Sequence, residues 1–150
     1  MRGEAMKKLY VVLASAMLMS AHFIGAYHRS FNNKTPYPLI VTIKRIAGGE
    51  STETINPDEK KTISHGIYAI DWVKVKADIP GKGFVEAVSE EKNIGAVSLD
   101  YLIFCQPKIT SQQIAGGVRF ITDKIRFFLF RYAAPARPGG IVAEGAWINL

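Results

Sequence analysis

After residue 38 the chain consists largely of short runs in which apolar and polar side chains alternate. This period of two is typical of β-strands with one buried face. The clearest run covers residues 67–77, where Val73 and Val75 alternate with Lys74 and Lys76. Groups of Gly, Pro, Asn and Asp separate the runs and indicate turns. We expect strands at residues 39–46, 51–55, 61–64, 67–77, 97–105, 109–115 and 141–150.

Two segments fit a helix as well as a strand. Residues 84–93 have apolar positions at helical spacing, but they also begin with an apolar pair followed by alternation, so we expect a strand that runs into a polar loop. Residues 118–132 are strongly hydrophobic, and three phenylalanines within four positions favour a pleated strand. We expect a hairpin there, with arms at residues 118–122 and 125–132 and a turn at Asp123-Lys124.

The segment before these strands differs from them in composition. Residues 27–38 are polar and contain two prolines, so we expect an irregular stretch, in which Asn33-Lys34-Thr35 has the form of an N-glycosylation site. The remaining chain offers roughly eight to ten short strands and no convincing long helix. Residues 27–150 are therefore predicted to form one all-β domain, an antiparallel β-sandwich, with a small β-barrel as the alternative.

The first 26 residues have the pattern of a secretory signal peptide. Lys7 and Lys8 precede an apolar run at residues 9–19, and the small residues Gly25-Ala26 follow it. We expect a helical signal peptide over residues 1–26 that is cleaved after Ala26, with cleavage after Ala21 or an uncleaved anchor as alternatives. The expected location is therefore secreted or periplasmic.

The net charge argues against a nucleic-acid partner, and the cysteine content argues against stabilisation by disulfides. The chain has 19 basic and 13 acidic residues, a net charge of +6, and loses three basic and one acidic residue with the first 26 residues. A remaining charge of +4 is too mild to indicate nucleic-acid binding, so we expect no nucleic-acid partner. Cys105, the single cysteine, cannot form an intramolecular disulfide. We expect it to be buried and inert, with a reactive thiol or an intermolecular disulfide as alternatives.

Residue types that catalyse reactions or bind metals are sparse. After residue 26 the only histidines are His28 and His65, which are not closely spaced, so we expect no metal site and no cofactor. His65 stands at a strand break and is expected to be solvated. Its neighbour Ser64 and the nearby Asp71 do not make a catalytic triad, because alternate side chains of a strand face opposite ways. Glu90-Glu91 is expected to be a solvated surface pair.

One strand offers a candidate contact surface. In residues 125–132, alternation places four side chains on one face, namely Arg126, Phe128, Phe130 and Tyr132. If that face is exposed, it presents a cationic aromatic stripe suited to lipid headgroups, glycans or another protein. The alternative is a central strand with both faces buried and its arginines near the ends.

These patterns favour a non-catalytic function. We expect an exported binding or interaction module of the cell envelope or extracellular space, whose partner is a protein, a glycan or a lipid surface component. A membrane- or lipid-binding protein that uses the aromatic stripe in peripheral contact is one alternative. A small hydrolase with a non-contiguous site is the other.

Overall fold

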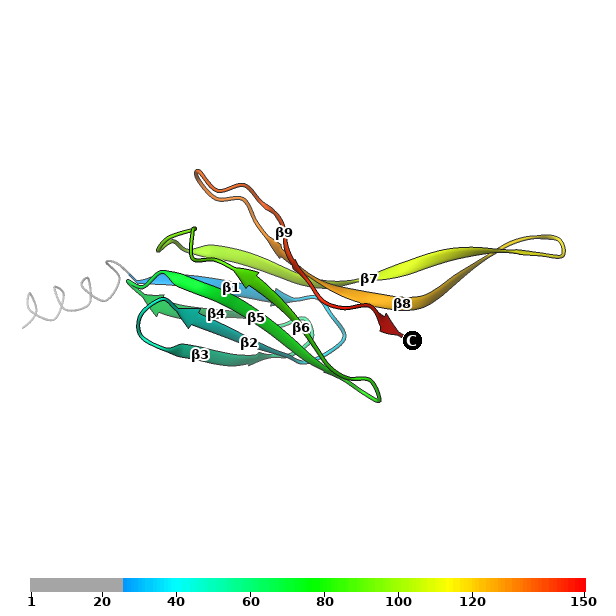
Figure 1. The fold of residues 1–150 in the computed structure, drawn as a ribbon, viewed down its shortest axis with the longest axis horizontal. Helices are drawn as coiled ribbons and strands as arrows, with labels where there is room; N and C mark the ends of the chain where they lie inside the picture. The colour runs from blue at the N-terminus through cyan, green and yellow to red at the C-terminus, as the bar shows by residue number, and fades with distance from the viewer. Residues whose placement is uncertain (1–25) are drawn as a thin grey trace, which may run out of the picture.

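Ten strands arranged in two sheets make up the computed structural model, which describes residues 26–150 (Figure 1). Sheet A has the order β10-β8-β7-β1-β4, with β9 also paired to β8, and sheet B has the order β3-β2-β5-β6. The strands of sheet A are β1 (Tyr27–Asn33), β4 (Lys60–Gly66), β7 (Leu99–Ile114), β8 (Gly117–Arg131), β9 (Gly140–Glu144) and β10 (Ile148–Asn149). Those of sheet B are β2 (Leu39–Arg45), β3 (Glu50–Ile55), β5 (Ile70–Ile79) and β6 (Gly83–Glu90).

The all-β prediction is confirmed for the described residues, which contain strands and no helix. The two sheets stay open rather than closing into one barrel, so the arrangement is β-sandwich-like and the barrel alternative is wrong. The predicted signal peptide lies outside the described residues, apart from Ala26.

One hydrophobic core lies between the sheets. Alternate residues of both sheets point into it, as the period-two pattern predicts: Val73 and Val75 are buried, and Lys74 and Lys76 are not. Each fully buried large side chain stabilises the fold by about 1.5–3 kcal/mol relative to exposure. The large apolar side chains with the deepest burial are Phe31, Leu39, Ile43, Ile55, Ile70, Tyr101, Ile103 and Leu129.

The amino-terminal strand β1 corrects two predictions. Residues 27–33 form a regular strand between β4 and β7, not an irregular segment. The pairing of β1 with β7 is parallel, whereas every other strand pair is antiparallel. Polar side chains concealed this strand, because Arg29, Ser30 and Asn33 are buried with hydrogen-bond partners and so interrupt the apolar alternation.

Asn33 ends β1 in a position that excludes modification of the folded chain. Its amide nitrogen donates hydrogen bonds to the carbonyl oxygens of Tyr37 (2.8 Å) and Ile55 (2.9 Å). Its amide oxygen accepts from the backbone nitrogen of Thr35 at 2.9 Å, and the side chain is fully buried. In the folded chain, residues 33–35 thus form a hydrogen-bonded turn, and the buried amide of Asn33 is out of reach of a glycosylating enzyme.

The hairpin β7–β8 is longer than the alternation indicated. The two strands predicted at residues 97–105 and 109–115 are one strand, and those at 118–122 and 125–132 are another. The turn lies at Ala115-Gly116, where Gly116 has a φ of 93°, which is open to glycine without strain. Asp123-Lys124 is not a turn, because Asp123 is the extra residue of a bulge between the pairs Lys108–Lys124 and Ile109–Thr122.

The carboxyl-terminal strand predicted at residues 141–150 divides in two. β9 and β10 pair with different parts of β8, on either side of Gly145. The backbone nitrogen of Gly145 donates to the carbonyl oxygen of Phe127 at 2.9 Å. A Cβ atom at this position would lie 3.2 Å from Val85, so the close approach to β6 favours glycine.

Candidate functional site

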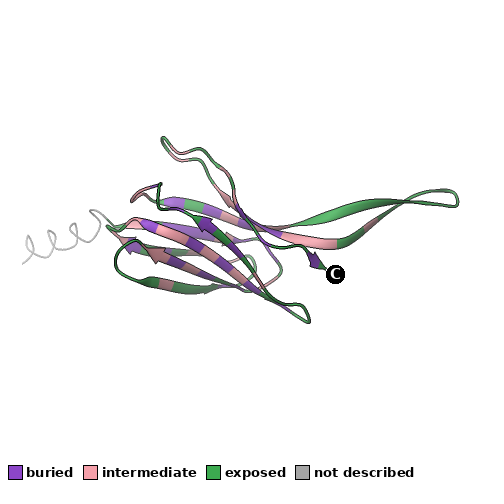
Figure 2. Cartoon of the chain, in the orientation of Figure 1, coloured by how far each residue is buried: buried purple, intermediate pink, exposed green. Residues whose placement is uncertain are grey.

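The distal half of the β7–β8 hairpin leaves the body of the protein as a two-stranded arm, residues 108–124 (Figure 1). β1 pairs with β7 only as far as Ile103, and β10 pairs with β8 only at Lys124 and Ile125. Neither strand of the arm beyond these points has a second neighbour. Figure 2 shows the arm coloured almost entirely as exposed, in contrast to the banded strands of the body. It is the part of the described chain that reaches farthest from the core.

Large apolar side chains on this arm are open to solvent. Phe120 is 73% exposed and Ile109 is 63% exposed. The strand register places Ile109 and Phe120 on the same face as Val118, with Ser111, Gln113 and Thr122 between them. This face continues the side of β7 that carries Tyr101 and Ile103 in the core, but sheet B does not extend under it. The apolar face of the arm is therefore uncovered.

The opposite face of the arm carries its basic side chains, beside Thr110, Ile114 and Ile121. Lys108 pairs with Lys124, and Arg119 pairs with Gln112. Between Asp100 and Asp123 the sequence contains no acidic residue. The arm thus combines exposed apolar side chains with an excess of positive charge.

The tip of the arm is entirely apolar in composition. Residues 114–118 are Ile-Ala-Gly-Gly-Val and contain no polar side chain. Ile114 and Val118 are each 49% exposed, and the register puts them on opposite faces of the hairpin. The end of the arm is therefore apolar on both faces, and Arg119 follows directly behind it.

The predicted aromatic stripe lies on the outer face of sheet A, nearer the body. Phe127 and Leu129 point into the core, so Arg126, Phe128, Phe130 and Tyr132 alternate with them on the outside. Their exposure is unequal. Phe128 is only 7% exposed, whereas Phe130 is half-buried and Tyr132 is 46% exposed.

Neighbouring rings and strands cover Phe128. Its ring stacks on that of Phe104 at a centroid distance of 5.4 Å, and the guanidinium of Arg126 lies 5.9 Å from the same ring. Arg126 is itself held in place, because it forms an ion pair with Glu144 at 2.8 Å and donates from Nε to the carbonyl oxygen of Gly145 at 2.7 Å. The positive charge of the stripe is thus paired, and Tyr132 is its most accessible ring.

A polar cluster inside the body corrects two predictions. Glu91 is buried, not solvated, and its Oε2 lies 3.2 Å from Nη2 and 3.3 Å from Nε of Arg29, which is equally buried. The hydroxyl of Tyr101 donates to the other carboxylate oxygen of Glu91. Burial and the adjacent carboxylate raise the pKa of Tyr101 far above its usual range. The second glutamate of the predicted surface pair is therefore part of the interior.

His65 belongs to the same cluster and is buried rather than solvated. Its Nδ1 lies 2.7 Å from the carbonyl oxygen of Tyr68, an acceptor, so Nδ1 carries the proton. Its Nε2 accepts from Nη1 of Arg29 at 3.2 Å. The ring is thus neutral, since a second proton would face a guanidinium. Burial lowers the pKa of His65 below 6.5, and the charges of Arg29 and Arg45 lower it further.

This environment predicts a loss of stability in mild acid. Between the lowered pKa of His65 and 6.5, the unfolded chain binds more protons than the folded chain, so the free energy of unfolding falls as the pH falls through this interval. Urea unfolding at pH 7.5, 6.5 and 5.5 measures the slope. His65→Gln is expected to remove this part of the slope, and the exposed His28→Gln is expected to keep it. Equal slopes in the two variants would contradict the assignment.

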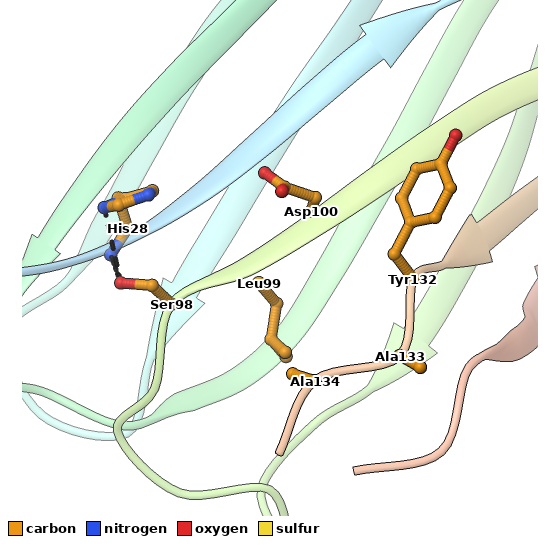
Figure 3. A pocket seen from close by; sticks show the side chains of 7 residues that line it. All are labelled: His28, Ser98, Leu99, Asp100, Tyr132, Ala133 and Ala134. Carbon is orange, nitrogen blue, oxygen red and sulfur yellow. Dashed lines mark hydrogen bonds between the residues drawn. The ribbon is translucent and has the colours of Figure 1, made fainter.

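A small hollow on the surface brings together residues that a hydrolase would need (Figure 3). It has a volume of about 100 Å³ and is lined by His28, Ser98, Leu99, Asp100, Tyr132, Ala133 and Ala134. Nδ1 of His28 lies 3.3 Å from the hydroxyl of Ser98. His28 and Ser98 are 70 positions apart in the sequence, and the parallel pairing of β1 with β7 brings them together. Alternation along a single strand does not reveal such a contact.

The hollow does not have the geometry of a catalytic triad. A triad needs a carboxylate bonded to the second nitrogen of the histidine. Among the described residues, Asp100 pairs with Lys60 at 4.0 Å and makes no hydrogen bond to His28. The volume is also well below the roughly 300–1,000 Å³ of typical small-molecule sites. The hydrolase alternative therefore gains no support here.

Cys105 is half-buried on β7 and is a free thiol. Burial raises its pKa to about 11, so the nucleophilic thiolate is scarce at neutral pH. This favours the inert interpretation over a reactive thiol.

Comparisons with known proteins give no matching family model, no matching curated protein and no matching solved structure. Across residues 26–150, no helix has the length and apolar character to cross a membrane. In the same part of the chain, no group of three or more His, Cys, Asp or Glu side chains is placed to hold a metal ion.

Proposed function

We propose that this protein is an exported, non-catalytic interaction module that engages its partner through the arm. The observation that carries the proposal is the arm itself, a two-stranded hairpin whose large apolar side chains are open to solvent. An isolated two-stranded hairpin is only marginally stable in water, and apolar side chains outside the core contribute little to folding. Contiguous exposed apolar surface of this kind marks interaction sites in folded proteins.

The outer aromatic face of β8 is a second candidate contact surface, on the side of sheet A opposite the apolar face of the arm. Phe130 and Tyr132 meet edge to face at a centroid distance of 5.4 Å and present ring surface to solvent. Phe128 stacks on Phe104 on the same outer face, and Arg126 holds the neighbouring carboxyl-terminal segment through Glu144 and Gly145. Such a surface suits a protein, a glycan or a lipid surface, and requires no cofactor.

Photo-crosslinking tests the function with a matched pair of residues. A photoreactive amino acid replaces Phe120 on the arm in one variant and Phe84 on β6 in the other, in the full chain produced in cells of its own organism. Both phenylalanines are well exposed, at 73% and 60%. We expect a discrete cross-linked species from position 120 and none from position 84. No adduct at position 120, or the same adducts at both positions, would overturn the proposal.

The same residue gives a stability prediction. Phe120→Ser is expected to change the free energy of unfolding by no more than about 0.5 kcal/mol, because the ring is outside the core. Urea unfolding of the variant beside the unaltered chain measures the difference. A loss of several kcal/mol would show that the arm is part of the folded core and not a binding element.

A further inference from the structure

We propose that the arm binds the surface of an anionic lipid bilayer by inserting its tip, residues 114–118, into the interfacial region. The inference rests on the proposed function and names its partner. Charge complementarity favours this occupant: the 22 residues from Tyr101 to Thr122 contain Lys108 and Arg119 and no acidic residue. Anionic headgroups attract such a segment, and each basic residue near the surface strengthens binding by about fivefold.

The distribution of apolar side chains indicates insertion by the end of the hairpin. Contact through one side would use only the face that carries Val118 and Phe120, but Ile114 is exposed on the other face. A tip that is apolar on both faces is suited to insertion into a bilayer, where lipid contacts both faces. Arg119 stands next to this tip, where a guanidinium can bind phosphate groups of the headgroup layer.

The depth available in the interface matches the length of the apolar tip. Interfacial segments reach about 5–10 Å into the headgroup and acyl boundary. At about 3.3 Å per residue, this depth takes two or three residues of each strand, counted from the turn. Two residues cover Gln113 and Ile114 on β7 and Gly117 and Val118 on β8, and the third pair is Gln112 with Arg119, so Phe120 lies just above the inserted part. The backbone groups of so short an insertion stay within reach of headgroups and water, so no closed barrel is required.

The position of the arm leaves its tip unobstructed. Figure 1 shows the hairpin turn at the right end of the view, well clear of sheet B and of the other strands of sheet A. Phe84, the other well-exposed phenylalanine, lies instead on the face of sheet B with the ammonium group of Lys76 4.1 Å above its ring. Within residues 26–150, the arm is the segment that projects beyond the body.

The edges of the arm argue against a second copy as the occupant. Strand addition needs an open edge with unpaired backbone groups, and proteins protect such edges with proline, lysine and bulges. Pro107 and Lys108 stand on β7 at the base of the arm, and the bulge at Asp123 interrupts β8 beside them. These features interrupt edge-to-edge pairing at the base of the arm, whereas the tip stands clear of the body as a contact.

A fluorescent label at the tip tests the proposal in the full chain, independently of how the first 26 residues behave toward lipid. A polarity-sensitive dye is attached to Ala115→Cys in a Cys105→Ala background, and a matched dye to Lys82→Cys at the turn between β5 and β6. Vesicles are phosphatidylcholine alone or phosphatidylcholine mixed with phosphatidylglycerol. We expect a blue shift of the dye at position 115 with the anionic vesicles only, and none at position 82.

Substitutions at the tip complete the test. Arg119→Gln is expected to raise the anionic lipid concentration at half-maximal response by about fivefold. Val118→Ser with Phe120→Ser is expected to abolish the response while the melting temperature is unchanged. Three outcomes would overturn the inference. They are no blue shift of the dye at position 115, an equal blue shift with both kinds of vesicle, and a blue shift that depends on protein concentration when no vesicles are present. A protein adduct at position 120 with no vesicle response would overturn it while sparing the proposed function.

Discussion

Replacing Glu91 by Leu is expected to lower the free energy of unfolding by about 3–5 kcal/mol, because it leaves the guanidinium of Arg29 buried without its counter-charge. Both side chains are fully buried, so water cannot compensate the lost partner. The substitution also removes the acceptor of the Tyr101 hydroxyl. Urea unfolding measures the change.

Two further variants test whether the loss comes from the broken buried ion pair or from the removal of any glutamate in this segment. Glu90→Leu is the matched control, since Glu90 adjoins Glu91 but is exposed and lies 4.0 Å from Lys92 in a surface pair. Its effect is expected to stay within about 1 kcal/mol. The double variant Arg29→Met with Glu91→Leu is expected to recover part of the lost stability, since neither charge is then buried alone. The rest stays lost, because Nε2 of His65 and the hydroxyl of Tyr101 no longer have these partners. Similar losses in Glu90→Leu and Glu91→Leu would contradict the buried pair.

Replacing Phe127 by Ala is expected to cost about 3–5 kcal/mol of unfolding free energy. The ring is buried in the core and meets that of Tyr37 edge to face at a centroid distance of 6.0 Å. Phe120→Ala is the same substitution seven positions earlier on the same strand, and it is expected to have an effect within about 0.5 kcal/mol. Thermal and urea unfolding of the two variants compare them.

This pair of variants locates the end of the core along β8. Equal losses would mean that the arm packs against something in the folded protein, and equal tolerance would mean that Phe127 is not a core residue. Phe128→Ala provides an intermediate case, because its ring is covered on the outer face by Phe104 and Arg126 rather than by the core.

Alternation along the sequence was sufficient to predict the all-β class and most strands of sheet B. It failed for β1, because a strand whose buried residues include Arg29 and Asn33 does not show an apolar period. The same cause hid the interior positions of His65 and Glu91. Their partners lie 36 and 62 residues from them in the sequence, so local patterns cannot reveal that these polar groups are satisfied.

The arm illustrates a second limit of sequence patterns. Pro107 and Asp123 look like strand breaks, but a proline can stand where a strand has an open edge, and an extra residue can form a bulge. Alternation also shows which residues share a face, but not whether a second sheet covers that face. Alternation alone therefore does not distinguish Ile109 and Phe120 from core residues.

The parallel contact between β1 and β7 has a consequence for how the polypeptide acquires its structure. His28 and Ser98, which lie beside each other at the start of this contact, are 70 positions apart. The first strand therefore cannot complete its ladder until two thirds of the chain is available. Chains dominated by such distant pairings fold on a scale of milliseconds to seconds rather than microseconds. A polypeptide delivered amino-terminus first would keep its earliest strand half-paired until β7 arrives.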